Sequence, residues 1–257
     1  MSNYNYTIGI IGGGVVGQAV AAFFKGAKVY DKFKPLDKLE EVLKQDLIFV
    51  CVPTPYENGF DRSYLDDAFS HFKNLADKIV VIKSTSLPGT TDYFQAQYPH
   101  IKVLFNPEFL TEKTAGYDFL NPDKQLVGYT VKSQDVAEAV LQILPDAPYK
   151  KVLPAKAAEL VKYAINSFYA TKVIFGNLLY DIAESLGVDY ADVKSAFVSD
   201  KRISDSHFEV MHGGYRGFGG KCLPKDLKAL RDFGKGHGVD VSLLEKVDEL
   251  NSKYKKA

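Results

Sequence analysis

The turn after the first apolar segment is the feature that most restricts the possible folds of this chain. Residues 6–11 are typical of a buried strand, residues 12–17 (GGGVVG) follow at once, and a helical pattern comes next. A G-x-G-x-x-G turn between a strand and a helix is the arrangement that binds a dinucleotide. Gly12 permits the tight turn, Gly14 lets the backbone approach a pyrophosphate, and Gly17 allows close packing of helix and strand. The sequence therefore predicts a dinucleotide-binding fold at the N-terminus.

An acidic residue indicates which dinucleotide is expected. Asp31 ends the second short strand and lies 19 positions after Gly12. A carboxylate at about this spacing accepts hydrogen bonds from the ribose hydroxyls of adenosine and repels a 2′-phosphate. NAD is therefore predicted as the cofactor, in preference to NADP.

Strands and helices alternate up to about residue 150, which predicts an α/β fold with a Rossmann-type, doubly wound, mostly parallel sheet. The apolar segment 47–52 is typical of a central parallel strand, and Cys51 inside it is predicted to be a core residue. Ligands bind at the carboxyl ends of such strands. The loop 83–90 follows a predicted buried strand. It is either an ordinary turn or a loop that binds a ligand. Glu108 and Glu112 are either an exposed pair or a base and a binding element.

The pattern changes after Pro154, where residues 155–186 predict one long helix that stops at Gly187. Further helices are predicted near 190–197 and from 226 onward, so residues 1–150 form the predicted NAD-binding domain and 151–257 an all-helical substrate and dimerisation domain. The long helix is apolar around much of its circumference, which predicts a homodimer. Glu159, Lys162 and Asn166 share one helical face, either as a solvated stripe or as a functional set.

A thiol near the C-terminal end is the candidate nucleophile. Cys222 lies within the segment 217–226 (GFGGKCLPKD), just after a glycine-rich turn, with Lys225 and Asp226 close behind it. A nearby cation can lower the pKa of a thiol and make it a nucleophile. The alternative is a buried structural cysteine.

Composition excludes several other classes. The formal net charge is zero, with 32 basic and 32 acidic residues, which argues against nucleic acid or an anionic membrane as the main partner. Two cysteines provide no disulfide framework, the N-terminus lacks the features of a signal peptide, and no apolar run is long enough to span a membrane. We expect a soluble cytoplasmic protein without a metal site.

Seven motifs, in this order, resemble those of the UDP-glucose/GDP-mannose dehydrogenase family. They are residues 12–17, 52–55 (VPTP), 83–85 with 88–91, 106–110 (NPEFL) with Glu112, 121–123 (NPD), 158–162 (AELVK) with Asn166, and 218–222 (FGGKC) with 224–226 (PKD). Together they span almost the whole chain.

The resemblance implies an activity. It implies NAD-dependent oxidation of the primary alcohol of a nucleotide sugar, UDP-glucose above all, to a carboxylate through two hydride transfers, with a thiohemiacetal and then a thioester on Cys222. Lys162 is the expected cation for oxyanions, Asn166 holds water or sugar, Glu108 and Asp226 manage protons, and Thr85 positions water. The implied cofactor contacts are Gly12, Gly14, Val15, Val16, Gly17, Asp31, Val52, Pro53, Thr54, Thr85 and Glu112. The implied substrate contacts are Phe109, Leu110, Thr111, Glu112, Lys162, Asn166, Arg216, Gly217, Phe218 and Gly219.

Some features depart from the family pattern. Lys113, Lys124 and Lys221 replace a glycine, an arginine and a small residue, and the family's third, nucleotide-binding domain is expected to be missing. A raised KM and weak discrimination between uracil and other bases are therefore expected. Two alternatives stay open: a dehydrogenase of a smaller alcohol or hydroxy acid, and a non-catalytic NAD-binding dimeric partner protein.

Overall fold

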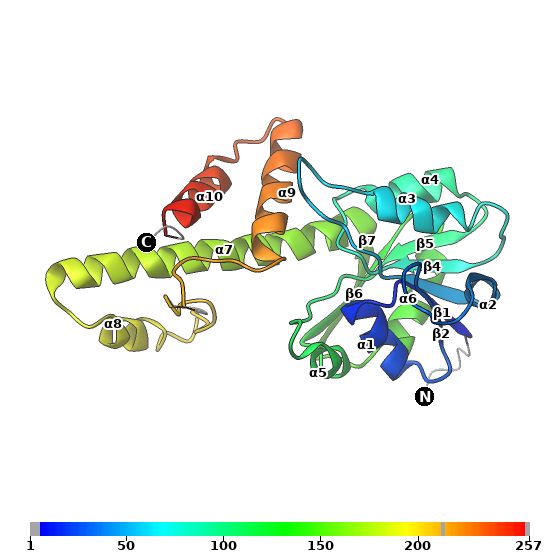
Figure 1. Cartoon of the computed structure of the whole chain (residues 1–257), viewed down its shortest axis with the longest axis horizontal. Coiled ribbons are helices and arrows are strands. Elements are labelled where there is room, and N and C mark those ends of the chain that lie inside the picture. The colour runs from blue at the N-terminus through cyan, green and yellow to red at the C-terminus, as the bar shows by residue number, and fades with distance from the viewer. Residues whose placement is uncertain (1–5, 212–213, 255–257) are drawn as a thin grey trace. The chain divides into compact units, whose positions relative to one another are not determined.

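The structure is a computed structural model that describes residues 6–211 and 214–254, and it divides into two compact units, Met1–Lys162 and Tyr163–Ala257 (Figure 1). The first unit has the predicted α/β architecture and the second is helical, so the predicted fold class is confirmed. The division by function into an NAD-binding domain up to residue 150 and a substrate domain after it stays a prediction.

A seven-stranded sheet with the order β2-β1-β3-β4-β5-β6-β7 forms the centre of the first unit. Neighbouring strands are parallel except β5 and β6, which pair antiparallel. The strands are β1 (Ile8–Ile11), β2 (Lys28–Tyr30), β3 (Leu47–Val50), β4 (Ile79–Ile82), β5 (Lys102–Phe105), β6 (Lys124–Tyr129) and β7 (Tyr149–Pro154). The central strands β1, β3 and β4 are buried throughout, as expected for strands covered on both faces.

Helices cover both faces of the sheet. Side chains point to alternate faces along each strand, so they enter two separate apolar cores. Ile10 and Phe49 belong to one core and Ile11 and Ile48 to the other. The first core includes side chains of α1 (Val15–Phe23), α5 (Ala115–Leu120) and α6 (Gln134–Ile143). The second includes side chains of α2 (Leu39–Leu43), α3 (Ser63–Ser70) and α4 (Thr90–Gln97).

The long helix α7 (Ala155–Leu186) has the predicted bounds, and it begins in the first unit and continues into the second. The second unit adds α8 (Tyr190–Phe197), α9 (Leu223–Gly236) and α10 (Ser242–Tyr254). Its apolar core joins Ala170, Val173 and Ile174 of α7 to Phe218, Leu227 and Val247. In residues 6–211 and 214–254, no helix combines the length and the apolar character needed to cross a bilayer.

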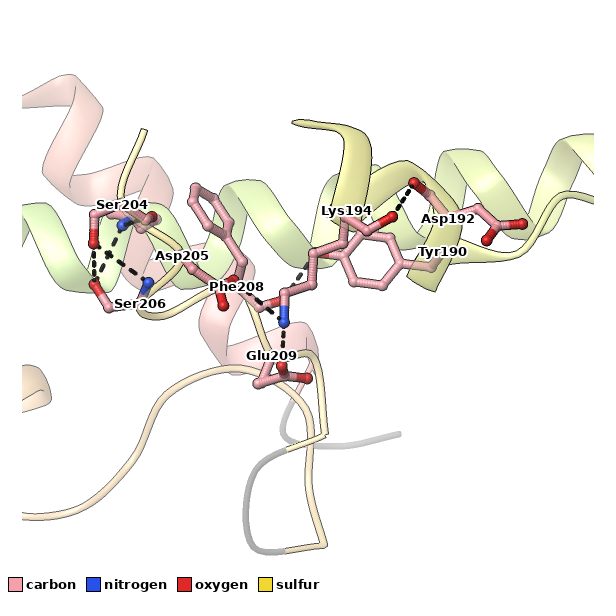
Figure 2. A network of polar contacts seen from close by, with 10 residues as sticks. Tyr190, Asp192, Lys194, Ser204, Asp205, Ser206, Phe208 and Glu209 are labelled. Carbon is pink, nitrogen blue, oxygen red and sulfur yellow. Dashed lines mark hydrogen bonds and ion pairs between the residues drawn. The ribbon is translucent and has the colours of Figure 1, made fainter. Parts of the chain in front are cut away.

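A polar network holds the chain that connects α8 with the Cys222 segment (Figure 2). Lys194 of α8 forms ion pairs with Asp205, at 3.4 Å, and with Glu209. The hydroxyl of Tyr190 donates to the carbonyl oxygen of Phe208 at 2.9 Å. Residues 205–209, which follow α8 without forming a helix or strand, are therefore tied to it by charged and hydroxyl groups.

Candidate active site

The glycine turn has the geometry that a dinucleotide site requires. Gly12 has a φ of 104°, and a Cβ there would lie 2.4 Å from the carbonyl oxygen of Cys51. A Cβ at Gly17 would lie 1.8 Å from the carbonyl oxygen of Gly12, so only glycine allows α1 to approach β1 this closely. A Cβ at Gly14 would meet no atom within 4 Å, which leaves the N-terminus of α1 open to a phosphate. Val15 and Val16, predicted cofactor contacts, are the first residues of α1.

Asp31 is fixed against the same turn. One carboxylate oxygen accepts a hydrogen bond from the Gly13 N–H at 2.8 Å, and the other accepts from the Phe33 N–H at 2.9 Å. Lys34 donates its Nζ proton to the carbonyl oxygen of Gly13 at 2.6 Å, a contact that motif spacing did not predict. A cavity of about 60 Å³ lies here, and its lining includes the predicted residues Gly12, Asp31, Val52 and Pro53.

The loops after β3 and β4 are bonded to each other. Thr54 donates its hydroxyl to the carbonyl oxygen of Thr85 at 2.8 Å, and Ser84 donates to that of Val52 at 2.7 Å. The hydroxyl of Ser86 bonds within the loop, to the carbonyl oxygen of Ser84. Hydrogen bonds within and between the two loops therefore account for part of this hydroxyl-rich segment. The same bonds bring the predicted residues Val52, Thr54 and Thr85 together.

A buried ion pair connects the end of β5 with α7. The Nζ of Lys162 lies 2.9 Å from a carboxylate oxygen of Glu108, and these side chains are only 6% and 14% exposed. The other oxygen of Glu108 accepts from the Leu110 N–H at 2.8 Å. Burial pushes the pKa of Glu108 upward, but the charge of Lys162, the Leu110 N–H and the charge of Lys83 outweigh it and leave the pKa below its usual value. Glu108 is thus not half of an exposed pair.

The surroundings of this pair include other predicted substrate contacts. The ring of Phe109 lies 5.5 Å from the Nζ of Lys162 and 4.7 Å from that of Lys124. Phe109 and Thr111 also line a cavity of about 310 Å³. Glu112, by contrast, is exposed.

Glu159 is a site residue to which sequence reasoning gave no role. Its carboxylate accepts hydrogen bonds from the Gly89 N–H at 2.6 Å, the Thr91 N–H at 2.8 Å and the Thr91 hydroxyl at 2.6 Å. It therefore caps the N-terminus of α4 from α7. Burial raises the pKa of Glu159 to about 7. Glu159, Lys162 and Asn166 are all buried, so the hypothesis of a solvated stripe is wrong.

The second unit contains three further candidate catalytic residues, Asn166, Cys222 and Asp226. Cys222 is exposed and directly precedes α9, so the alternative of a buried structural cysteine is wrong. Asp226, in the first turn of α9, is only 1% exposed and accepts hydrogen bonds from Asn166 Nδ2 and from Lys225 Nζ, both at 2.5 Å. The buried carboxylate of Asp226 is thus held between the side-chain amide of Asn166 and the ammonium of Lys225.

Residues 216–219 are also fixed within the second unit. The backbone of Phe218 makes two hydrogen bonds with the side chain of Asn251, at 2.7 and 3.1 Å. The guanidinium of Arg216 bonds to Asn177 Oδ1 at 3.0 Å and to Asp181 at 2.6 Å. Gly217, Phe218 and Gly219 line a cavity of about 410 Å³. In the parts of the chain that the structure describes, no cluster of three or more His, Cys, Asp or Glu residues could hold a metal ion.

Two parts of the chain match known domains. Residues 25–144 match the NAD binding domain of the UDP-glucose/GDP-mannose dehydrogenase family, and residues 156–253 match its central domain. NAD is the cofactor that the first of these domains binds, in agreement with the prediction from Asp31.

Individual relatives agree with this match. The chain is similar to a UDP-glucose 6-dehydrogenase of Rickettsia conorii, with 35% identity over 82% of this chain and 50% of that protein. UDP-glucose 6-dehydrogenase AglM of Haloferax volcanii is 31% identical over 86% of this chain and 55% of that protein. The chain thus spans about half the length of the curated relatives it matches.

A solved structure extends the comparison to the fold. A UDP-glucose dehydrogenase from Pyrobaculum islandicum is 30% identical, with a TM-score of 0.86 over 97% of this chain and 68% of that one. Its sequence identity and coverage, together with the two matching domains, show that the chain belongs to the UDP-glucose/GDP-mannose dehydrogenase family.

Proposed function

We propose that this chain oxidises the primary alcohol of a nucleotide sugar, UDP-glucose, to the carboxylate of UDP-glucuronate in two NAD-dependent steps. The observation that carries the proposal is the surroundings of Cys222: an exposed thiol before α9, four residues from the buried carboxylate of Asp226 and its partner Asn166. Relatives named UDP-glucose 6-dehydrogenase support the choice of substrate.

The residues of the glycine turn fit NAD. The open N-terminus of α1 at Gly14 would hold the pyrophosphate, and Asp31, already fixed by the Gly13 N–H, has lone pairs left for ribose hydroxyls. When bound, NAD accepts the hydride that each oxidation releases.

The first oxidation takes a hydride from the alcohol carbon and a proton from its hydroxyl, and leaves an aldehyde. Glu108 is the proposed acceptor of the proton, because its carboxylate is ionised and buried. Lys162, within hydrogen-bond distance of Glu108, supplies the positive charge that stabilises a developing alkoxide.

The second oxidation depends on the thiol. The sulfur of Cys222 forms a bond to the aldehyde carbon while the thiol proton passes to the aldehyde oxygen. The resulting thiohemiacetal then loses this hydroxyl proton and a second hydride to give a thioester. Water then adds to the thioester carbon, the carbon–sulfur bond breaks, and the carboxylate and the free thiol are released. Asp226 is the proposed proton acceptor for water, oriented by Asn166, and Thr85 is the proposed water-positioning residue.

Counting NADH against sugar tests the proposal. Two NADH per UDP-glucose consumed, with UDP-glucuronate as the product, is the expected result. One NADH per molecule of a smaller alcohol or hydroxy acid, with no oxidation of UDP-glucose, would favour a dehydrogenase of simple alcohols. Binding of NAD without turnover of either substrate would favour a non-catalytic partner protein.

We also propose that α7 pairs two copies of the chain. Its exposed apolar side chains recur at helical spacing, and they include Leu160, Phe168, Phe175, Leu178, Ile182 and Leu186. Sedimentation should therefore show a dimer that Phe168→Glu with Leu178→Glu converts into a monomer. A monomer of the unmodified protein at high micromolar concentration would contradict this assignment.

A further inference from the structure

The first unit buries a second lysine near the Glu108–Lys162 pair. Lys83 directly follows β4 and is only 3% exposed. Its Nζ donates to the side-chain oxygen of Asn106 at 2.5 Å and lies 5.3 Å from the centre of the Phe119 ring. A buried ammonium whose hydrogen bond goes to a neutral amide is costly, so its retention calls for an explanation.

Asn106 connects Lys83 with two further strands. Asn106 is fully buried and directly follows β5; its backbone N–H donates to the carbonyl oxygen of Ile82 at 2.8 Å, and its side-chain Nδ2 donates to that of Leu126 at 2.7 Å. A side-chain amide accepts hydrogen bonds at its oxygen and donates them from its nitrogen. Because the Lys83 ammonium bonds to the oxygen of Asn106, the nitrogen of Asn106 points toward β6. Lys83 thereby selects a single orientation of Asn106 across β4, β5 and β6.

The orientation of Asn106 affects Glu108 because only Pro107 separates them. Proline fixes its own φ and restricts the residue before it, so this link has little freedom. The Glu108 carboxylate makes one contact with Lys162 and one with the Leu110 N–H, and both demand a definite backbone position. A shift at Asn106 would therefore misplace Glu108.

Charge gives Lys83 a second route to Glu108. Burial lowers the pKa of Lys83 to about 8, the charge of Glu108 opposes this shift, and that of Lys162 adds to it. The ionisable groups that act on Glu108 are thus Lys162 on α7 and Lys83 after β4, with Cys51 after β3 nearby. Burial raises the pKa of Cys51 to about 12, so its thiol stays neutral. The charges of two buried lysines thus act on one largely buried carboxylate.

We propose that Lys83 is a positioning residue: through Asn106 it fixes the backbone that carries Glu108, and its positive charge supports the pairing of Glu108 with Lys162. The consequence for turnover rests on the proposed function, because it requires Glu108 to accept a proton. The effect on Glu108 itself does not, and it is measurable without any substrate.

The test compares Lys83→Met, Lys83→Gln and Lys78→Met. Methionine removes both the charge and the donor, and glutamine keeps a donor for Asn106 without the charge. Lys78, just before β4, bonds to the carbonyl oxygen of Lys44 on the surface and serves as the matched control. We expect kcat to fall about 30-fold in Lys83→Met and less in Lys83→Gln, with the KM for NAD unchanged and Lys78→Met like the unmodified protein.

The direct readout is the titration of Glu108 by carbon NMR, with its carboxyl signal identified through Glu108→Gln. In both Lys83 variants the midpoint should rise by about one pH unit. A role in folding alone would instead lower the free energy of unfolding and leave the midpoint unchanged, and that result would overturn the proposal. If the midpoint rises but Glu108→Gln keeps full activity, the proposed function of Glu108 fails, and the catalytic part of the inference fails with it.

If Lys83→Met does not fold, Asn106→Asp keeps the proposal testable. It preserves an acceptor for Lys83 and removes the donor to Leu126, so kcat should fall as in Lys83→Met. An Asn106→Asp protein with normal kcat and a normal Glu108 midpoint would overturn the proposal.

Discussion

The two cysteines of this chain have the same side chain in opposite surroundings, one in each unit. Cys51 follows β3 in the sheet core, where it is 8% exposed and burial raises the pKa of its thiol to about 12. Cys222 is exposed, follows a glycine with a φ of 73° at Gly220, and precedes the N-terminus of α9. Surroundings, and not the residue type, therefore decide which thiol is available for chemistry.

The first unit also contains charged groups that, unlike the thiol of Cys222, are shielded from solvent and fixed by protein partners. Its ionisable groups Lys83, Glu159 and Lys162 are buried and Glu108 is largely buried, and each bonds to a defined protein partner. Groups fixed in this way can stabilise charge without reorganising during a reaction. Substitutions of Cys222, Lys162, Glu159 and Asp31 can test the contrast between buried, fixed groups and the accessible thiol.

Replacement of each cysteine should separate the two regions most clearly. Cys222→Ser should lower the rate of UDP-glucuronate formation by about 10³-fold or more, because a serine hydroxyl is a far weaker nucleophile at neutral pH. NAD affinity should not change, because Cys222 is not among the expected contacts of NAD. Cys51→Ala is the matched control and should keep turnover. Product assays and NAD titrations provide both values, and equal rates of acid formation by the serine variant would refute a covalent mechanism.

Loss of one buried charge should be costly for stability. Lys162→Met leaves the Glu108 carboxylate buried without its partner, so we expect the free energy of unfolding to fall by about 3 kcal/mol. The double variant Lys162→Met/Glu108→Gln should recover most of this loss, because no unpaired charge remains. Urea denaturation measures both values. An equal loss in the single and double variants would show that the charge is not the cause.

Glu159 should make stability depend on pH. Burial raises its pKa in the folded protein to about 7, against an ordinary value of 4.5. Between these values the folded protein binds more protons than the unfolded one, so the contribution of Glu159 is present below about pH 4.5 and is lost as pH rises through 7.

The measurement is urea denaturation across this pH range. The decline between pH 4.5 and 7 should be smaller in Glu159→Gln by on the order of 2 kcal/mol. Glu138→Gln, at an exposed position of α6, is the control. Identical pH profiles for Glu159→Gln and the unmodified protein would rule out this role for Glu159.

The carboxylate of Asp31 is only partly buried, so its replacement should have the smallest effect. Asp31→Ala removes both the acceptor for ribose hydroxyls and the charge that repels a 2′-phosphate, so the preference for NAD over NADP should fall about tenfold. Kd values for the two cofactors measure the change. Equal affinity of the unmodified protein for NAD and NADP would contradict the role of Asp31.

Local sequence patterns predicted the parts of the fold that depend on local order. The helix 155–186 was predicted with its observed bounds, because the segment is periodic, lacks proline and is followed by Gly187. β7 was missed, since Tyr149–Pro154 is a polar edge strand with three exposed residues in a row and no apolar alternation. Polarity is a common property of edge strands and removes the signal on which a prediction depends.

Sequence patterns also identified candidate site residues without showing which of them meet. The bonds from Thr91 to Glu159 and from Lys83 to Asn106 join positions 68 and 23 residues apart. Glu159 and Lys83 both lie inside motifs of the family resemblance, yet nothing local distinguishes a buried acid or lysine from an exposed one. Only the packing of α4, β5 and α7 determines these partners.

The covalent intermediate is the most direct test of the central claim. The protein should be mixed with NAD and UDP-glucose, quenched in acid during the first turnovers, digested and analysed by mass spectrometry. A substrate-derived acyl group on the peptide that contains Cys222, absent from the Cys51 peptide and lost on mild base treatment, is the predicted result. UDP-glucuronate formed at full rate with an adduct-free Cys222 peptide at every quench time would contradict it.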